Sequence, residues 1–300
     1  MEDLEDMGKN MDYRLKRVIG EGAFSRVYLT EDRNGQQYAC KVSTEVRLLR
    51  REAEILGSLH HPLFPVYVGY EETGGEGRLF MEYIPGRNLR KVMCVRKFSA
   101  MQTMRIAGEL ADGLLYLHER QPVILYRDLK PENIMLCENG HIRLIDLGCA
   151  CRQDAQGGAK TGTPGFAPQE QLVSGKTAGV YSDVYALGKT VQSMLAEKGR
   201  RCDREGGCIE KSYGRRRKRR MGGKHCPNVK RKYFREERRC RRRLERMINF
   251  AVRDDFRQRP QDMVEVLCIL TGQKKVEKDV ICEKNIWESH YKNPCSLPLI

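Results

Sequence analysis

The stretch that decides the fold runs Tyr126-Arg127-Asp128-Leu129-Lys130-Pro131-Glu132-Asn133. It follows an apolar strand and holds a carboxylate and an amide, Asp128 and Asn133, five residues apart in a loop. A second triplet, Asp146-Leu147-Gly148, begins thirteen residues after Asn133 and also follows an apolar strand. Each triplet alone is typical of a turn. Together they supply a carboxylate that orients a reacting hydroxyl and oxygen ligands that suit magnesium.

Two more features precede these motifs. A glycine-bearing turn, Gly20-Glu21-Gly22-Ala23-Phe24-Ser25, lies between two predicted strands. Its glycines let backbone N–H groups approach phosphate oxygens, and the strand after it argues against a dinucleotide fold. Lys41 ends the next strand. We expect Glu52 on the following helix, in preference to Glu54, to pair with Lys41, because Glu52 shares a face with apolar residues.

Taken in chain order, these motifs supply the groups that phosphoryl transfer requires: an orienting carboxylate, magnesium ligands and a cation on the phosphates. With these motifs in order, the chain resembles the protein kinase family over roughly residues 13–272. The resemblance implies an α+β, two-lobed protein-kinase-like fold, with a small β-rich N-lobe holding one key helix and a larger, mainly helical C-lobe. It also implies ATP and Mg²⁺ as cofactors, and protein substrates with Ser or Thr acceptors. Residues 162–171 resemble bacterial Ser/Thr kinases in particular.

The resemblance assigns the chemistry to a few side chains. Asp128 matches the catalytic aspartate, and Lys130 matches the lysine that meets the transferred phosphate. Lys41 and Glu52 match the ion pair beside the nucleotide phosphates. The implied magnesium ligands are Asn133 and Asp146.

The resemblance also places the nucleotide. The turn at 20–25 lies over the phosphates, and Met81 occupies the gatekeeper position. Backbone groups of Glu82 and Ile84 in the hinge meet the adenine. The side chains that sandwich the adenine ring are Val27, Ala39 and Met135.

A loop further along the chain, Thr161-Gly162-Thr163-Pro164-Gly165-Phe166, resembles the end of a kinase activation loop, which seats the substrate backbone. Thr161 or Thr163 is an expected autophosphorylation site, with Arg127 as the receiver of the phosphate and Thr161 the better candidate. Glu170 and Arg259 match a buried ion pair of the family. Asp183 matches the aspartate that braces the catalytic loop.

Four positions depart from the family pattern. Tyr126 replaces a His, Leu147 replaces a Phe, and Ser25 replaces the third glycine; the usual Ala-Pro-Glu is Pro168-Gln169-Glu170. None of these changes removes a group that does chemistry. Tyr126 and Leu147 belong to the hydrophobic stack that holds the active shape, so we expect these two to affect regulation rather than competence.

The charge of the chain is concentrated in one segment. The 300 residues carry a formal charge of +15, yet residues 198–243 alone hold 21 Lys/Arg and 5 Asp/Glu, so the remainder is close to neutral. This segment is either a solvated insertion, a contact for nucleic acid or an anionic membrane, or a docking site for an acidic protein. A zinc site at its cysteines is disfavoured because close Cys pairs are missing.

The expected organisation has four parts: an acidic lead over 1–12, the N-lobe and hinge over 13–84, the C-lobe over 85–272 with 198–243 as a basic insertion, and a tail over 273–300. Strands are expected at 17–30, 38–42, 65–71 and 78–84, and helices at 45–59, 99–117, 183–196 and 233–270. No apolar run approaches the length of a membrane span. We therefore expect a cytoplasmic protein whose cysteines are reduced.

Two other functions compete with an active protein kinase. One is a pseudokinase scaffold that binds partners through the basic segment. The other is a small-molecule kinase of the same fold. The presence of Lys41, Asp128, Asn133 and Asp146 counts against the first. The Thr161–Phe166 loop and the Glu170–Arg259 match count against the second.

Overall fold

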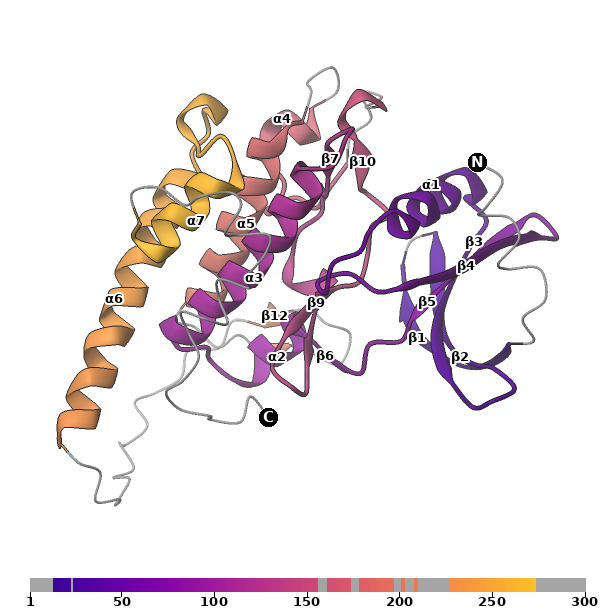
Figure 1. The fold of residues 1–300 in the computed structure, drawn as a ribbon, viewed down its shortest axis with the longest axis horizontal. Helices are drawn as coiled ribbons and strands as arrows, with labels where there is room; N and C mark the ends of the chain where they lie inside the picture. Colours follow the sequence, from indigo (N-terminus) through magenta and orange to yellow (C-terminus); the bar gives the residue numbers. More distant parts are fainter. Residues whose placement is uncertain are drawn as a thin grey trace.

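The computed structural model describes residues 13–22, 24–155, 161–173, 178–196, 201–202, 208–209 and 227–273. Ala23 of the glycine-bearing turn lies outside these residues, as do the lead 1–12, the six cations 215–220 and the tail from 274. Two regions are visible in Figure 1, a strand-rich one with the N-terminal part of the chain and a helical one with the rest.

The N-terminal region is a five-stranded antiparallel sheet in the order β1-β2-β3-β5-β4. Its strands are β1 (Arg14–Glu21), β2 (Ser25–Glu31), β3 (Gln37–Ser43), β4 (Tyr67–Thr73) and β5 (Glu76–Glu82). One helix, α1 (Val46–Gly57), lies between β3 and β4 in the chain and packs on the sheet through buried Leu49, Ala53 and Leu56. Because Glu52 occurs at the spacing of these residues, the same face of α1 buries its carboxylate.

The C-terminal region is mainly helical. Its helices are α2 (Leu89–Val95), α3 (Ala100–His118), α4 (Gln169–Leu172), α5 (Val180–Leu195), α6 (Pro227–Ala251) and α7 (Met263–Thr271). At its centre is α3, which begins with a capping box between Ser99 and Gln102 and contacts α5, α6 and α7. Four side chains of α3 that are fully buried form the middle of the core: Met104, Ile106, Leu110 and Leu114.

Short strands hold the loops that carry the two acidic motifs. They are β6 (Gly86–Asn88), β8 (Ile134–Cys137) and β9 (Ile142–Leu144) in one small sheet, and β7 (Ile124–Leu125) and β10 (Cys151–Arg152) in another. A further pair is β11 (Arg201–Cys202) with β12 (Cys208–Ile209), and single 3-10 turns lie at Pro131–Asn133, Gln153–Ala155 and Phe256–Gln258. Because β8 pairs with β9, Asn133 before β8 and Asp146 after β9 are brought to the same end of this sheet.

The predicted fold class is confirmed, and the last predicted helical region differs in detail. The expected helical region at 233–270 is two helices, α6 and α7, and α6 begins at Pro227, an early position where proline is well tolerated. The α6 helix is amphipathic, because Cys240, Leu244 and Met247 on one face are fully buried while arginines such as Arg238 and Arg242 are exposed. Its N-terminal turns extend past the other helices (Figure 1). None of the helices in the described residues is long and apolar enough to cross a membrane.

Six described cysteines follow the expectation and one does not. The free thiols are Cys40, Cys137, Cys149, Cys151, Cys240 and Cys268. Cys94 in α2 is disulfide-bonded, so the expectation of reduced cysteines is wrong there. Its partner lies outside the residues whose side chains are described. A pairing between distant segments depends on tertiary contacts, which cysteine spacing in the sequence does not reveal.

Candidate functional site

A cavity of about 930 Å³ lies between the five-stranded sheet and the helical region. It contains most of the predicted nucleotide contacts: Gly20, Glu21, Gly22, Ser25, Val27, Ala39, Met81, Glu82, Ile84 and Met135. The exception among the described residues is Phe24, whose side chain is 72% exposed and is not part of the lining. The N–H of Glu82 already donates to the carbonyl of Val66 at 2.8 Å. The backbone group of Glu82 that a ligand would meet is therefore its own carbonyl.

Lys41 is held at the back of this cavity by two carboxylates. Its Nζ donates to Glu52 Oε2 at 2.7 Å and to Asp146 Oδ1 at 2.8 Å. The predicted pairing with Glu52 is therefore confirmed, and the rival Glu54 is exposed. Glu52 also accepts from the N–H of Leu147 at 3.2 Å, which ties α1 to the Asp146-Leu147-Gly148 turn. This network therefore places the ammonium of Lys41 and the carboxylate of Asp146 side by side in the lining of the cavity.

These contacts fix the charges of Lys41 and Asp146. Burial alone would lower the pKa of Lys41, but the nearby Glu52 and Asp146 carboxylates outweigh burial and raise it above its ordinary value. Burial alone would raise the pKa of Asp146, but Lys41 and the N–H of Gly148 outweigh burial and lower it below its ordinary value. Both groups therefore stay charged at neutral pH, as the binding of a polyphosphate and a divalent cation requires.

Asp128 lies in a second network, next to the cavity-lining residues Lys130 and Asn133. Its carboxylate accepts from Lys130 Nζ at 2.7 Å, from Thr163 Oγ1 at 2.7 Å and from Asn133 Nδ2 at 3.0 Å. Lys130 Nζ also donates to Thr163 Oγ1 at 2.7 Å. The loop that begins at Thr161 is thus tied directly to Asp128, and a hydroxyl group already occupies hydrogen-bonding distance of its carboxylate.

The backbone of the Asp128 loop is braced from beneath. Asp183, fully buried at the start of α5, accepts from the N–H of Tyr126 at 2.9 Å and from the N–H of Arg127 at 2.8 Å. These bonds hold Arg127 at φ 68°, a left-handed conformation that is rare for a side chain of this size. The predicted position of Asp183 under this loop is confirmed. His118 at the end of α3, which the sequence did not single out, contacts the same carboxylate at 2.9 Å.

Arg127 connects this loop to the segment at 161–171. Its guanidinium donates to Thr161 Oγ1 and to Cys151 Sγ. Gln171 donates to the carbonyls of Arg127 and Thr161, and is a second residue that the sequence did not reveal. Burial raises the pKa of the neighbouring Cys149 thiol, which favours a packing role over a reactive one for that residue.

Glu170 and Arg259 form the predicted buried pair. Both Nη atoms of Arg259 donate to the Glu170 carboxylate, and the two side chains are 1% and 8% exposed. Arg259 also donates from Nε to the carbonyl of Arg253 at 2.7 Å. The pair fastens α4, directly after the 161–167 loop, to the turn before α7.

The polar groups of the cavity suit a magnesium–nucleotide ligand. Asn133 uses its Nδ2 as a donor to Asp128, which leaves the amide oxygen as its ligand atom, and Asp146 supplies a carboxylate. No cluster of three or more His, Cys, Asp or Glu side chains that would hold a metal occurs among the described residues. Two protein oxygens combined with phosphate oxygens and water are a donor set typical of Mg²⁺ bound with a nucleotide.

Comparison with known proteins agrees with this geometry. Residues 13–267 match the family model described as "Protein kinase domain". The chain is 34% identical over 201 residues to the cAMP-dependent protein kinase catalytic subunit of Dictyostelium discoideum, covering 62% of this chain and 30% of that protein. It is 31% identical to mitogen-activated protein kinase kinase kinase 3 of Homo sapiens, covering 63% and 33%. For Aurora kinase A-A of Xenopus laevis the identity is 30%, covering 62% and 48%. The chain spans only about a third to a half of the length of these relatives.

Proposed function

The chain belongs to the protein kinase family, and on that premise we propose that it transfers the γ-phosphate of ATP to Ser or Thr hydroxyls of protein substrates in the cytoplasm. The observation that supports this most strongly is the meeting, at one cavity, of the Lys41–Glu52–Asp146 network with the Asp128–Lys130 pair. The three relatives described above are eukaryotic, and the resemblance of residues 162–171 to bacterial kinases stays a prediction.

The proposed roles follow from position. Lys41 binds nucleotide phosphates, and Glu52 holds its ammonium in place. Asp128 orients the acceptor hydroxyl and receives its proton, while Lys130, 2.7 Å away, offsets charge on the transferred phosphoryl group. Asn133 and Asp146 would hold Mg²⁺, which supplies neutralisation of charge on the phosphate oxygens. The apolar side chains of Val27, Ala39 and Met135 would enclose the adenine.

One experiment tests the proposal as a whole. The protein is incubated with labelled ATP and Mg²⁺, alone and with a library of Ser/Thr peptides, and phosphosites are mapped by mass spectrometry. We expect ATP turnover and modified Ser or Thr residues. Nucleotide binding without turnover would support the scaffold alternative, and turnover with a small molecule but with no peptide would support the small-molecule alternative.

We also propose that Thr161 is an autophosphorylation site. Its hydroxyl already contacts Arg127, and a phosphate there would carry a charge of about −1.5 to −2 that pairs with the guanidinium. Thr163 is the weaker candidate because its hydroxyl is hydrogen-bonded to Asp128. Thr161→Ala is expected to remove a major phosphosite and to slow turnover. In Arg127→Gln, Thr161 should still be phosphorylated, but the phosphate should no longer raise turnover. Phosphosite mapping of active protein checks this, and unmodified Thr161 in that protein would refute it.

For the basic segment 198–243 we propose recruitment to a polyanion. The described part of α6 supports this, because Arg235, Arg238, Arg239 and Arg242 are all exposed. Arg238→Gln/Arg239→Gln/Arg242→Gln is expected to weaken binding to a duplex oligonucleotide and to flatten its log–log salt dependence by about 0.9 per lost contact. The matched control neutralises three exposed arginines elsewhere, Arg14, Arg33 and Arg47. Equal binding by both triple variants would contradict the proposal.

A further inference from the structure

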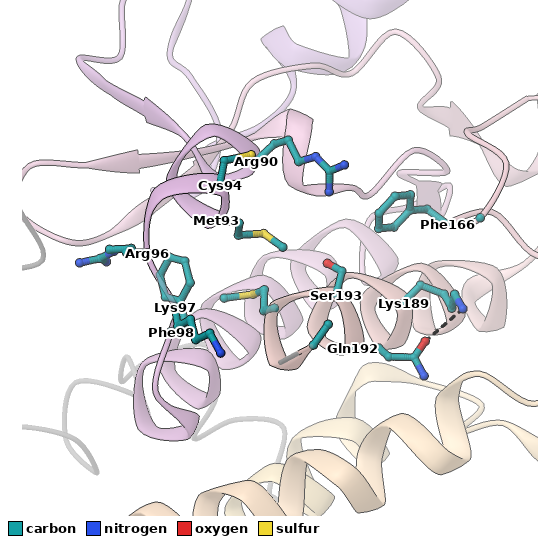
Figure 2. A pocket seen from close by; sticks show the side chains of 13 residues that line it. Arg90, Met93, Cys94, Arg96, Lys97, Phe98, Phe166, Lys189, Gln192 and Ser193 are labelled. Atoms are coloured by element: carbon teal, nitrogen blue, oxygen red, sulfur yellow. Dashed lines mark hydrogen bonds between the residues drawn. The ribbon is translucent and has the colours of Figure 1, made fainter. Parts of the chain in front are cut away.

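A second pocket, of about 280 Å³, lies beside the 161–167 loop, between α2 and α5 (Figure 2). Resting on the proposed kinase activity, we propose that this pocket binds an anionic side chain of the protein substrate, a carboxylate or a phosphate, and so selects acidic sequences. Gly165 and Phe166 close one side of it, and residues of α2 and the last turns of α5 form the rest.

The charge of the lining has one sign. Of the thirteen described residues that line the pocket, four are cations and none is Asp or Glu: Arg90, Arg96, Lys97 and Lys189. A concave site lined by one sign of charge concentrates ligands of the other sign. In Figure 2 the Arg90 side chain extends toward Phe166, and Lys189 lies on the same side of the pocket.

Lys189 is the cation best placed to meet a ligand. Its described partner is the neutral amide of Gln192, with Nζ to Oε1 at 3.1 Å, and no described carboxylate pairs with it. An ammonium has three donors, so an incoming anion can be added to this contact. Arg90 pairs with Glu132, with Nε to Oε1 at 3.4 Å, and its side chain is part of the pocket lining. Arg96 stacks on the Phe98 ring at 4.8 Å and shapes the far side.

The interior of the pocket complements the rest of an acidic side chain. Met93 and Met194 contribute apolar surface to the lining, and Ser193 contributes a hydroxyl. A side chain with a short aliphatic stem and an anionic end can therefore bury its stem against the methionines and place its charge near Lys189 and Arg90.

The pocket is close enough to the proposed reaction site to read the same peptide. Thr163 contacts Asp128 at 2.7 Å, and the pocket residues Gly165 and Phe166 follow two and three positions later. At no more than about 3.3 Å per residue, the Cα atom of Phe166 lies within roughly 10 Å of the Cα atom of Thr163, the residue that contacts Asp128. A substrate residue about two to four positions from the acceptor would reach it.

The test compares peptides that differ in one side chain. A neutral Ser peptide is prepared with Ala, Glu, phosphoserine or Lys at each position from four before to four after the acceptor, and kcat/KM is measured for each. We expect one position at which Glu is preferred over Ala by about 5- to 10-fold, phosphoserine at least equally, and Lys disfavoured. No position with an acidic preference would overturn the proposal, while phosphorylation of the neutral peptide would still uphold the proposed kinase activity.

Charge reversal assigns the preference to the pocket. Lys189→Glu is expected to lower the Glu-to-Ala ratio of kcat/KM at that position at least 10-fold and to favour Lys there. Arg33→Glu, an equal change of net charge on an exposed turn of the sheet region, is the matched control and keeps the wild-type ratio. An unchanged ratio in Lys189→Glu would overturn the assignment.

A binding measurement separates this proposal from the proposed activity. The acidic peptide with its acceptor Ser replaced by Ala is labelled, and its affinity is measured by fluorescence anisotropy with wild type, Lys189→Glu and Arg33→Glu. We expect Lys189→Glu alone to lose affinity, and raised salt to weaken the wild-type complex. Because this readout needs no turnover, equal affinity for all three proteins would refute the pocket even if the protein were not an active kinase.

Discussion

Asp128→Asn is expected to cut turnover by about 10²–10⁴-fold while leaving nucleotide binding nearly intact, the loss typical of a positioned acid–base group. Asparagine has the same shape and can still meet Lys130 and Thr163, which lie 2.7 Å from the carboxylate oxygens. What it lacks is the negative charge that orients the acceptor hydroxyl and receives its proton. Steady-state turnover and calorimetric nucleotide binding, measured on the same preparation, check both halves of the expectation.

Asp146→Asn serves as the contrasting variant. It removes a carboxylate proposed to hold Mg²⁺ and a partner of Lys41, so turnover and magnesium-dependent nucleotide binding should both fall. The matched control is Asp154→Asn, an exposed aspartate of the same loop region, which should behave as wild type. Wild-type turnover in Asp128→Asn would show that the catalytic assignment is wrong. Unchanged magnesium dependence in Asp146→Asn would show the same of the metal assignment.

Local patterns predicted the site well where the chemistry is set by short motifs. The side of α1 that carries Glu52 follows from the spacing of its apolar neighbours, and this spacing alone chose Glu52 over Glu54 as the partner of Lys41. Likewise, strands before Asp128 and Asp146 are short apolar runs that end in polar loops. In each case one periodicity or one turn fixes where the functional side chain lies.

Residues that act through distant backbone contacts were missed. His118 reaches Asp183 across 65 positions, and Gln171 reaches the carbonyl of Arg127 across 44. Neither residue belongs to a recognisable sequence pattern. His118 is simply the last residue of an apolar helix, and Gln171 follows the Pro168-Gln169-Glu170 triplet, which differs from the family's Ala-Pro-Glu. The α2 helix was also missed, because it is short and its cap comes from Asn88, whose side chain accepts from the N–H of Arg90 at 2.9 Å. Short helices depend on caps and packing more than on composition.

Arg259→Ala is expected to destabilise the protein by about 3–5 kcal/mol, because it leaves the buried Glu170 carboxylate without its compensating charge. Such a loss is a large part of the ~5–15 kcal/mol that holds a typical domain together. At about 2–4 °C per kcal/mol for a domain of this size, the melting temperature should fall by roughly 6–20 °C. A thermal melt followed by circular dichroism measures it. Arg257→Ala, two positions away and exposed, is the control and should shift stability by no more than about 0.5 kcal/mol.

A double replacement separates the charge from the rest of the arginine's contacts. In Glu170→Met/Arg259→Met neither partner leaves an uncompensated buried charge, so part of the lost stability should return. Recovery should be incomplete, because Arg259 also donates to the carbonyls of Arg253 at 2.7 Å and Asp254 at 3.1 Å, and these acceptors would be left without it. If the double variant is no more stable than Arg259→Ala, the loss of stability comes from the contacts of Arg259 with the backbone carbonyls and not from the unpaired charge of Glu170. An unchanged melting temperature in Arg259→Ala would contradict the role of the pair in fastening α4, and with it the 161–167 loop, to the helical region.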